Sequence, residues 1–130
     1  MNKEILTCLV IIVFVVLLNF ITMKYTKDTV IILCNDLYQF KSELLDKESI
    51  NKNSLIKRYN EIMDKWKKKY NIYTYYIEHD ELEKVETELT SLKANIETEE
   101  NKNGIENIER CIFILNHIKD KYSLDIRNIF

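Results

Sequence analysis

The residue types best suited to chemistry in this chain are its three cysteines and two histidines. Cys8, Cys34 and Cys111 form no C-x-x-C pair, so the sequence predicts neither a zinc ribbon nor a thioredoxin-type redox site. His79 is flanked by carboxylates that could bind a divalent metal, but adjacent helix residues do not face one another and no second histidine lies four positions away. We therefore expect no metal site, and His79 is a candidate interaction residue at a helix junction.

The other common catalytic patterns are missing from the sequence. No serine occurs in a G-x-S-x-G context, and phosphate-binding loops need glycines, of which the chain has one. We therefore predict a non-enzymatic protein without a cofactor. Cys34 and Cys111 are expected to be buried free thiols, although a disulfide between them stays open if the domain lies outside the cytoplasm.

Lysines and aromatic residues interleave around Trp66, and Tyr70 and Tyr73 follow at helical spacing. This pattern is typical of packed aromatic residues beside a solvated lysine face, and it also suits a lipid surface or single-stranded nucleic acid. Residues 52–69 carry seven basic and two acidic residues, but residues 78–100 carry nine acidic and two basic ones, and the pI is 5.8. We expect no nucleic-acid partner and keep Trp66, Tyr70 and Tyr73 as candidate interaction residues.

The elements that must position these residues begin with an apolar segment at residues 5–23. It contains no charge, and as a helix it extends about 28 Å, close to the hydrocarbon thickness of a bilayer. The small residues of a signal-peptide cleavage site do not follow it, because the only alanine is Ala94. We therefore expect a short tail at residues 1–4 and an uncleaved transmembrane anchor at residues 5–23.

The orientation of this anchor depends on the charges at its two ends. Lys3 and the α-amino group lie before it and Lys24 and Lys27 after it, so the positive charges are nearly tied. A short tail followed at once by an apolar run is typical of a signal anchor. We predict a single-pass protein of the cell membrane with its N-terminus inside and its C-terminal domain outside the cytoplasm.

Residues 24–130 carry apolar stripes at three- and four-residue spacing, which predicts helices and no strands. We expect an all-α fold, with the transmembrane helix followed by a small antiparallel bundle of three to four helices, or a parallel coiled-coil dimer as the alternative. Asn53 or Ser54 is expected to cap the second helix of this domain and Asp80 the third, with a turn at Gly104 before the fourth. The first of these helices could continue the transmembrane helix. The predicted helices cover about residues 28–47, 54–78, 81–99 and 105–122.

The chain reversal near His79 and Asp80 would set the register of the second and third helices of this domain. Residues equidistant from that point would face each other, which places Trp66 opposite Leu92. The apolar positions of both stripes match in this register, and a basic helix then lies along an acidic one. We therefore predict an antiparallel pair in which Trp66 contacts Leu92.

Two short motifs and the chain length resemble a known family. An apolar anchor precedes a helical domain with one tryptophan, followed by the run YYIEHDE at residues 75–81 and the terminal SLDIRNIF at residues 123–130. This pattern resembles the bacterial domain of unknown function 4363 family over nearly the whole chain. The resemblance implies a membrane-anchored helical domain outside the cytoplasm, and it implies no activity, ligand or catalytic residue.

From these observations we expect a non-enzymatic docking or scaffold module that binds another membrane or envelope protein and is held in the lipid bilayer. The apolar residues Ile129 and Phe130 near the end of the chain are further candidate interaction residues. The sequence is also compatible with a homodimer. The alternative function is a lipid-surface or ligand-sensing module that uses the Trp/Tyr/Lys-rich face.

Overall fold

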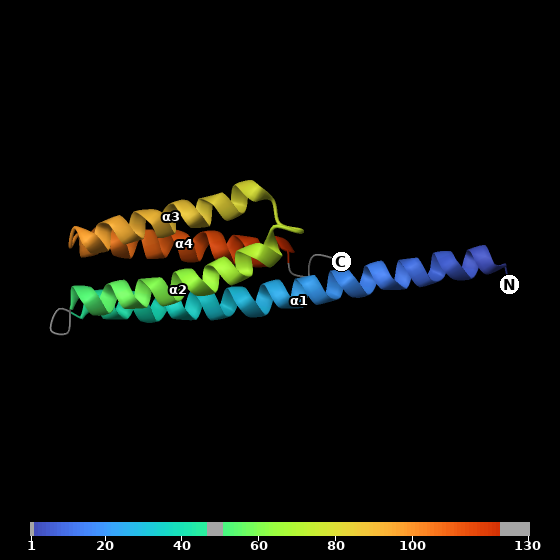
Figure 1. Cartoon of the computed structure of the whole chain (residues 1–130), viewed down its shortest axis with the longest axis horizontal. Coiled ribbons are helices and arrows are strands. Elements are labelled where there is room, and N and C mark those ends of the chain that lie inside the picture. The colour runs from blue at the N-terminus through green and yellow to red at the C-terminus, as the bar shows by residue number, and fades with distance from the viewer. Residues whose placement is uncertain (1, 47–50, 123–130) are drawn as a thin grey trace.

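The structure, a computed structural model, describes residues 2–46 and 51–122. It contains four helices and, within these residues, no strand, which confirms the all-α prediction. Figure 1 shows the helices in chain order. They are α1 (Lys3–Leu45), α2 (Lys52–Tyr73), α3 (His79–Glu97) and α4 (Asn101–Tyr122).

Helix α1 is continuous over 43 residues and joins the predicted anchor to the first predicted helix of the domain. No proline or glycine interrupts it, and the hydroxyls of Thr26 and Thr29 donate back to the carbonyls of Thr22 and Tyr25, both at 2.7 Å. Burial begins at Thr26. The N-terminal half is long and apolar enough to cross a membrane, and none of its most apolar window is buried.

The C-terminal half of α1 forms a four-helix bundle with the other three helices. Each helix packs against two others, in the pairs α1–α2, α2–α3, α3–α4 and α1–α4. Short connections between successive helices make neighbours antiparallel. The N-terminal half of α1 projects beyond the bundle, as Figure 1 shows.

The two ends of the bundle carry different connections (Figure 1). At the exit end, where α1 leaves the bundle, lie the turn between α2 and α3 and the last turn of α4. At the far end lie the last turn of α1, the first turn of α2 and the turn between α3 and α4.

Several helix ends differ from the predictions. Asn51 caps α2, because its side chain accepts a hydrogen bond from the backbone N–H of Asn53 at 3.0 Å. Helix α2 ends at Tyr73 instead of residue 78, and α3 begins at His79 without a side-chain cap from Asp80. Asp80 lies in the first turn of α3, where a negative charge complements the helix dipole.

The predicted turn at Gly104 is wrong. Gly104 lies in the first turn of α4, where its N–H donates to the Glu100 carbonyl at 3.0 Å. The chain reverses at residues 98–100 instead, and Glu99 takes the left-handed backbone conformation with φ 59°. A residue other than glycine therefore terminates α3, so the composition of this turn does not reveal it.

The register between α2 and α3 also differs from the prediction. The turn occupies residues 74–78, so the reversal is centred before His79. The indole N–H of Trp66 accordingly donates to Glu86 at 3.3 Å, and Glu86 lies about 1.7 turns of helix before Leu92. The stripes matched in the predicted register because apolar residues recur every three or four positions, so a shift of about two turns preserves the match.

Candidate functional site

An aromatic cluster fills the exit end of the bundle. Its members are contributed by α1, α2, the following turn and α4, and their ring centroids lie 6.0–6.5 Å apart in successive pairs. Tyr73 lies at its centre and contacts three other rings. Tilted and edge-to-face rings at this separation attract one another through their quadrupoles. The cluster consists of Tyr25, Trp66, Tyr70, Tyr73, Tyr76 and Tyr122.

Two hydroxyl pairs connect this cluster to α1. The Tyr76 hydroxyl lies 2.6 Å from Thr26 Oγ1, and the Tyr73 hydroxyl hydrogen-bonds to Thr29. Both threonines already donate to backbone carbonyls of α1. The tyrosines are therefore the donors. Burial raises the pKa of Tyr73 far above its ordinary value, which keeps its proton available for this bond.

The structure places the predicted interaction residues differently. Trp66 is 1% exposed and Tyr73 is fully buried. Tyr70 packs against the core, and part of its side chain is exposed to solvent. His79 is exposed at the first residue of α3. Ile129 and Phe130 lie outside the described residues. The aromatic face therefore packs inward, and its part in an interaction stays a prediction.

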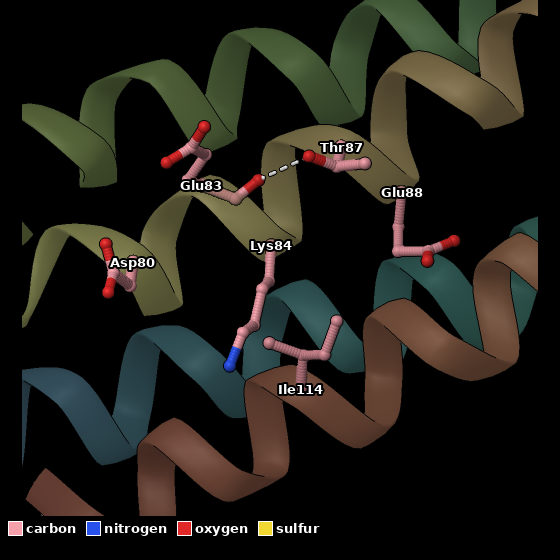
Figure 2. Close-up of a pocket in the computed structure, with 6 residues that line it drawn as sticks. All are labelled: Asp80, Glu83, Lys84, Thr87, Glu88 and Ile114. Carbon is pink, nitrogen blue, oxygen red and sulfur yellow. Dashed lines mark hydrogen bonds between the residues drawn. The ribbon is translucent and has the colours of Figure 1, made fainter.

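A groove runs along the outer surface between α3 and α4, which the sequence analysis did not single out. One part has a volume of about 400 Å³ and is shown in Figure 2. An adjoining part of about 310 Å³ shares Lys84 and Ile114 with it and is completed by Glu81, Phe113 and His117. In Figure 2 the side chain of Lys84 extends from α3 toward α4 and Ile114, whereas the carboxylate of Glu83 points to the other side of α3. The first part is lined by Asp80, Glu83, Lys84, Thr87, Glu88 and Ile114.

The groove combines an apolar anchor point with acidic walls. Phe113 is 75% exposed and lies beside the apolar stripe of α4 instead of on it. Four carboxylates and one lysine come from α3. Such a surface suits a segment that carries both an apolar and a basic side chain.

Glu81 lies at the bottom of this groove and is 7% exposed. Its Oε1 accepts a hydrogen bond from Lys121 Nζ at 3.2 Å and lies 3.5 Å from His117 Nε2. Its Oε2 has no hydrogen-bond partner among the described residues. The hydrogen bond to Glu81 raises the pKa of Lys121. Part of this buried carboxylate's capacity to accept hydrogen bonds is therefore unused.

A polar network beside the groove holds α3 to α4. Arg110 Nε lies 3.1 Å from both carboxylate oxygens of Glu88, and Glu88 accepts a further bond from Asn107 at 2.9 Å. Asn107 is buried and in turn accepts from Asn95. This chain satisfies a buried amide, and it fixes how the two helices that form the groove sit against each other.

Two of the three cysteines, Cys34 and Cys111, are poorly placed for nucleophilic chemistry. Cys34 and Cys111 are buried free thiols, as predicted. Burial raises their pKa from 9.0 to about 11 and about 12, respectively, so both are protonated near neutral pH. Among residues 2–46 and 51–122, no group of three or more His, Cys, Asp or Glu side chains is placed to hold a metal ion.

Sequence comparison gives the family of the chain. No curated protein and no solved structure matches it. The model of the family described as "Domain of unknown function (DUF4363)" matches residues 20–129. The match begins near the end of the apolar half of α1 and covers all of the bundle. The family resemblance inferred from the sequence motifs is thus confirmed, and the chain belongs to the DUF4363 family.

Proposed function

We propose that this protein is a single-pass membrane protein whose bundle docks another membrane or envelope protein through the α3–α4 groove. The continuity of α1 is the observation that carries the proposal. One helix runs from an apolar half with no buried residues into the core of the bundle. Exposing that half to water would be unfavourable in proportion to its apolar area, so a bilayer is its natural surroundings.

A cleaved signal sequence is the main competing interpretation of the apolar half. A signal sequence ends in small residues that suit the peptidase. Here the backbone is helical through this region, and Thr26, only three residues beyond the apolar segment, is already buried in the bundle. This arrangement favours an anchor that stays attached to its domain.

The groove supports a docking role with a specific kind of partner. Phe113 supplies an exposed apolar contact, and the carboxylates of Asp80 and Glu83 line the groove beside Glu88, which is already paired with Arg110. We propose that the occupant is a helical or extended segment of a second membrane or envelope protein, with an apolar side chain against Phe113 and a basic side chain among the carboxylates. Attachment to the same membrane raises the effective concentration of such a partner.

Site-specific photocrosslinking in intact membranes tests this proposal. A photoreactive amino acid replaces Phe113 in the full chain, and the matched control replaces Lys57, an exposed residue of α2 that does not line the groove. The proposal expects a discrete adduct with a different membrane or envelope protein from position 113 only. A second copy of this chain as the product, or equal adducts from both positions, would contradict it.

A charge-reversal variant tests whether the acidic side chains of the groove contribute to binding of the partner. Glu83→Lys changes the charge of one exposed groove residue without touching the core. It should weaken the adduct from position 113, whereas Glu61→Lys on α2 should leave it unchanged. Equal effects of both substitutions would show that general charge, and not the groove, controls binding.

The orientation of the anchor is part of the proposal. A periplasmic-type phosphatase reporter fused after residue 130 should be active, and the matching cytoplasmic reporter should be silent. The opposite pattern would place the bundle inside the cell and limit its partners to proteins accessible from that side.

A further inference from the structure

The turn between α2 and α3 presents an aromatic side chain at the exit end of the bundle. Tyr75 is 88% exposed, and Ile72, in the last turn of α2, is 44% exposed. Backbone hydrogen bonds hold the turn in a compact form, since the N–H groups of Tyr75 and Tyr76 donate to the carbonyls of Ile72 and Tyr73. The exposed ring is therefore carried on a well-formed turn.

The position of this turn along α1 is fixed by the hydroxyl pair of Tyr76 and Thr26. Thr26 lies three residues beyond Met23, the last residue of the apolar segment. At about 1.5 Å per residue the Tyr76 hydroxyl lies about 4.5 Å beyond the end of that segment along α1. The headgroup layer on each side of a bilayer is about 5–7 Å thick, so an anchored α1 places this hydroxyl, and with it the adjoining turn, at the level of the headgroups.

We infer that the turn of residues 74–78 contacts the bilayer in which α1 is anchored, with the Tyr75 ring at the boundary between headgroups and acyl chains. This inference depends on the proposed membrane anchoring of α1. Tyrosine suits this position because its ring is apolar and its hydroxyl can stay hydrated. The contact would be a second attachment of the bundle to the membrane.

The surrounding charges indicate what kind of lipid surface fits. Lys24 and Lys27 on α1 are exposed near the same level, and Lys69 Nζ lies 5.4 Å from the centre of the Tyr25 ring. The acidic Asp28 and Glu78 are exposed there as well. The mixed charges point to the interfacial layer of a bilayer in general, without a requirement for anionic lipid.

The far end of the bundle supplies a natural contrast. Its described turn, residues 98–100, has the sequence Thr-Glu-Glu and carries no aromatic or aliphatic side chain. The turn at the exit end reads Thr-Tyr-Tyr-Ile-Glu. Because both turns reverse the chain between helices of the same bundle, the difference is not explained by the need to form a turn.

Tryptophan quenching by brominated lipid tests the contact in the full chain reconstituted into phosphatidylcholine vesicles. Tyr75→Trp introduces a tryptophan at the turn, and Lys102→Trp introduces one at an exposed far-end position. The native Trp66 is buried, with its ring 6.1 Å from that of Tyr73, and it is present in both variants. Its contribution is measured with the native chain in the same vesicles and subtracted from the signal of each variant.

We expect the emission added by Tyr75→Trp to be blue-shifted and strongly quenched by lipid brominated near the top of the acyl chain. The emission added by Lys102→Trp should be neither. The result should be the same with and without phosphatidylglycerol in the vesicles. Equal quenching at both positions, or quenching at position 75 only with anionic lipid, would overturn the inference.

The same vesicles distinguish a failure of this inference from a failure of the anchoring proposal. If alkaline carbonate releases the protein from the vesicles, α1 does not span the bilayer and the proposed function itself fails. If the protein stays with the vesicles but the tryptophan at position 75 is unquenched, only the contact of the turn is disproved.

Discussion

The exit end and the far end of the bundle are held together in different ways. At the exit end, aromatic rings surround Tyr73 and two tyrosine hydroxyls bond to threonines of α1. At the far end, aliphatic side chains such as Leu44 and Leu92 pack around Gly104. The buried side chains of α1 therefore make directional bonds at the exit end and only close packing at the far end, where the hydrogen bond from Asn95 to the buried Asn107 joins α3 to α4 instead.

The difference matches what each end has to do. At the exit end α1 leaves the bundle, so its rotation about its own axis and its position along that axis must be fixed relative to the other helices. Hydroxyl pairs and ring edges have preferred geometries and supply that specificity. At the far end the aliphatic side chains of α1 exclude water, which they do without orientation requirements. For α1, the specific contacts of its buried side chains are therefore concentrated where it leaves the bundle.

The largest effect is expected from a charge placed in the far end. Leu92→Asp would bury a carboxylate among aliphatic side chains, because Leu92 is 1% exposed and contacts α4 at Gly104. We expect a loss of about 4 kcal/mol or more in the free energy of unfolding. Lys68→Ala, at an exposed position of α2, should change it by less than about 0.5 kcal/mol.

The measurement is denaturant unfolding of the full chain in detergent, followed by the emission of the single tryptophan. Native Trp66 should emit at short wavelength because it is buried. A red shift in Leu92→Asp without denaturant would show that damage at the far end unfolds the whole bundle. Intact Trp66 emission in this variant would instead show that the two ends unfold independently.

The pKa values of the buried thiols report how well water is excluded from the core between the two ends. Burial raises the pKa of Cys111 from 9.0 to about 12. Below pH 9.0 the thiol is neutral in both states and contributes no pH dependence. Between pH 9.0 and about 12 only the unfolded chain releases the proton, so the free energy of unfolding should fall as pH rises, by up to about 1.4 kcal/mol per pH unit.

Alkaline titration of stability checks this slope. Cys111→Ala should reduce the slope in that interval, and Cys34→Ala should reduce it over a shorter interval, because the Cys34 pKa is about 11. Burial also raises the pKa of Tyr73, so a residual slope of the same sign stays in both variants. Identical slopes in the native chain and in Cys111→Ala would mean that water reaches the thiol and that the core is wetter than its packing indicates.

The hydroxyl pairs at the exit end should make a smaller contribution. Tyr73→Phe removes the donor to Thr29 but keeps the ring, so we expect a loss of about 1 kcal/mol. A double-mutant cycle with Thr29→Val isolates the bond itself. Tyr76→Phe should cost less because Tyr76 keeps contact with water. Tyr38→Phe, at an exposed position, is the control. A coupling energy of zero between Tyr73 and Thr29 would mean that this hydrogen bond does not stabilise the exit end.

Most of the core could be predicted from the sequence, because burial follows helical periodicity. The stripe residues Val30, Leu37 and Phe40 are buried, as are Val85 and Leu89 on α3. Periodicity reports which residues face inward, and this holds wherever the helices begin and end. For the same reason it could not fix the ends or the register of α2 and α3.

The errors have particular causes. Tyr73 and Ile77 are both buried although α2 ends between them, because the turn folds back and keeps Ile77 in the core. A stripe that crosses a turn cannot be distinguished in sequence from a longer helix. Gly104 looks like a turn residue, but it lies in α4 against Leu92 and Leu44.

The groove could not be predicted because it depends on which helices become neighbours. Glu81 and His117 are 36 positions apart and meet only when α3 lies against α4. The one available signal was Phe113, a large aromatic residue that lies off the apolar stripe of α4 and is therefore exposed. The buried Asn107 was equally visible in sequence, but its partners on α3 were not.

The smallest effect is expected from Gly104→Ala, which tests whether the far end depends on close approach. A Cβ atom built at Gly104 would lie 3.5 Å from Leu92 Cδ1 and 3.7 Å from Leu44 Cδ1, which is ordinary van der Waals contact. The residue is helical, so alanine should be favoured by its smaller loss of backbone entropy. We expect a gain of about 0.5–1 kcal/mol in the free energy of unfolding.

The sign of this effect decides between two accounts of the far end. If the far end has room for a methyl group, Gly104→Ala raises the melting temperature of the full chain in detergent. Gly104→Leu should overpack the site and lower the free energy of unfolding by about 1–3 kcal/mol. If Gly104→Ala also destabilises the bundle, Leu92 and Leu44 are packed too tightly to move away from the added methyl group. The far end would then be as geometrically specific as the exit end, and the contrast between directional bonding and plain packing would fail.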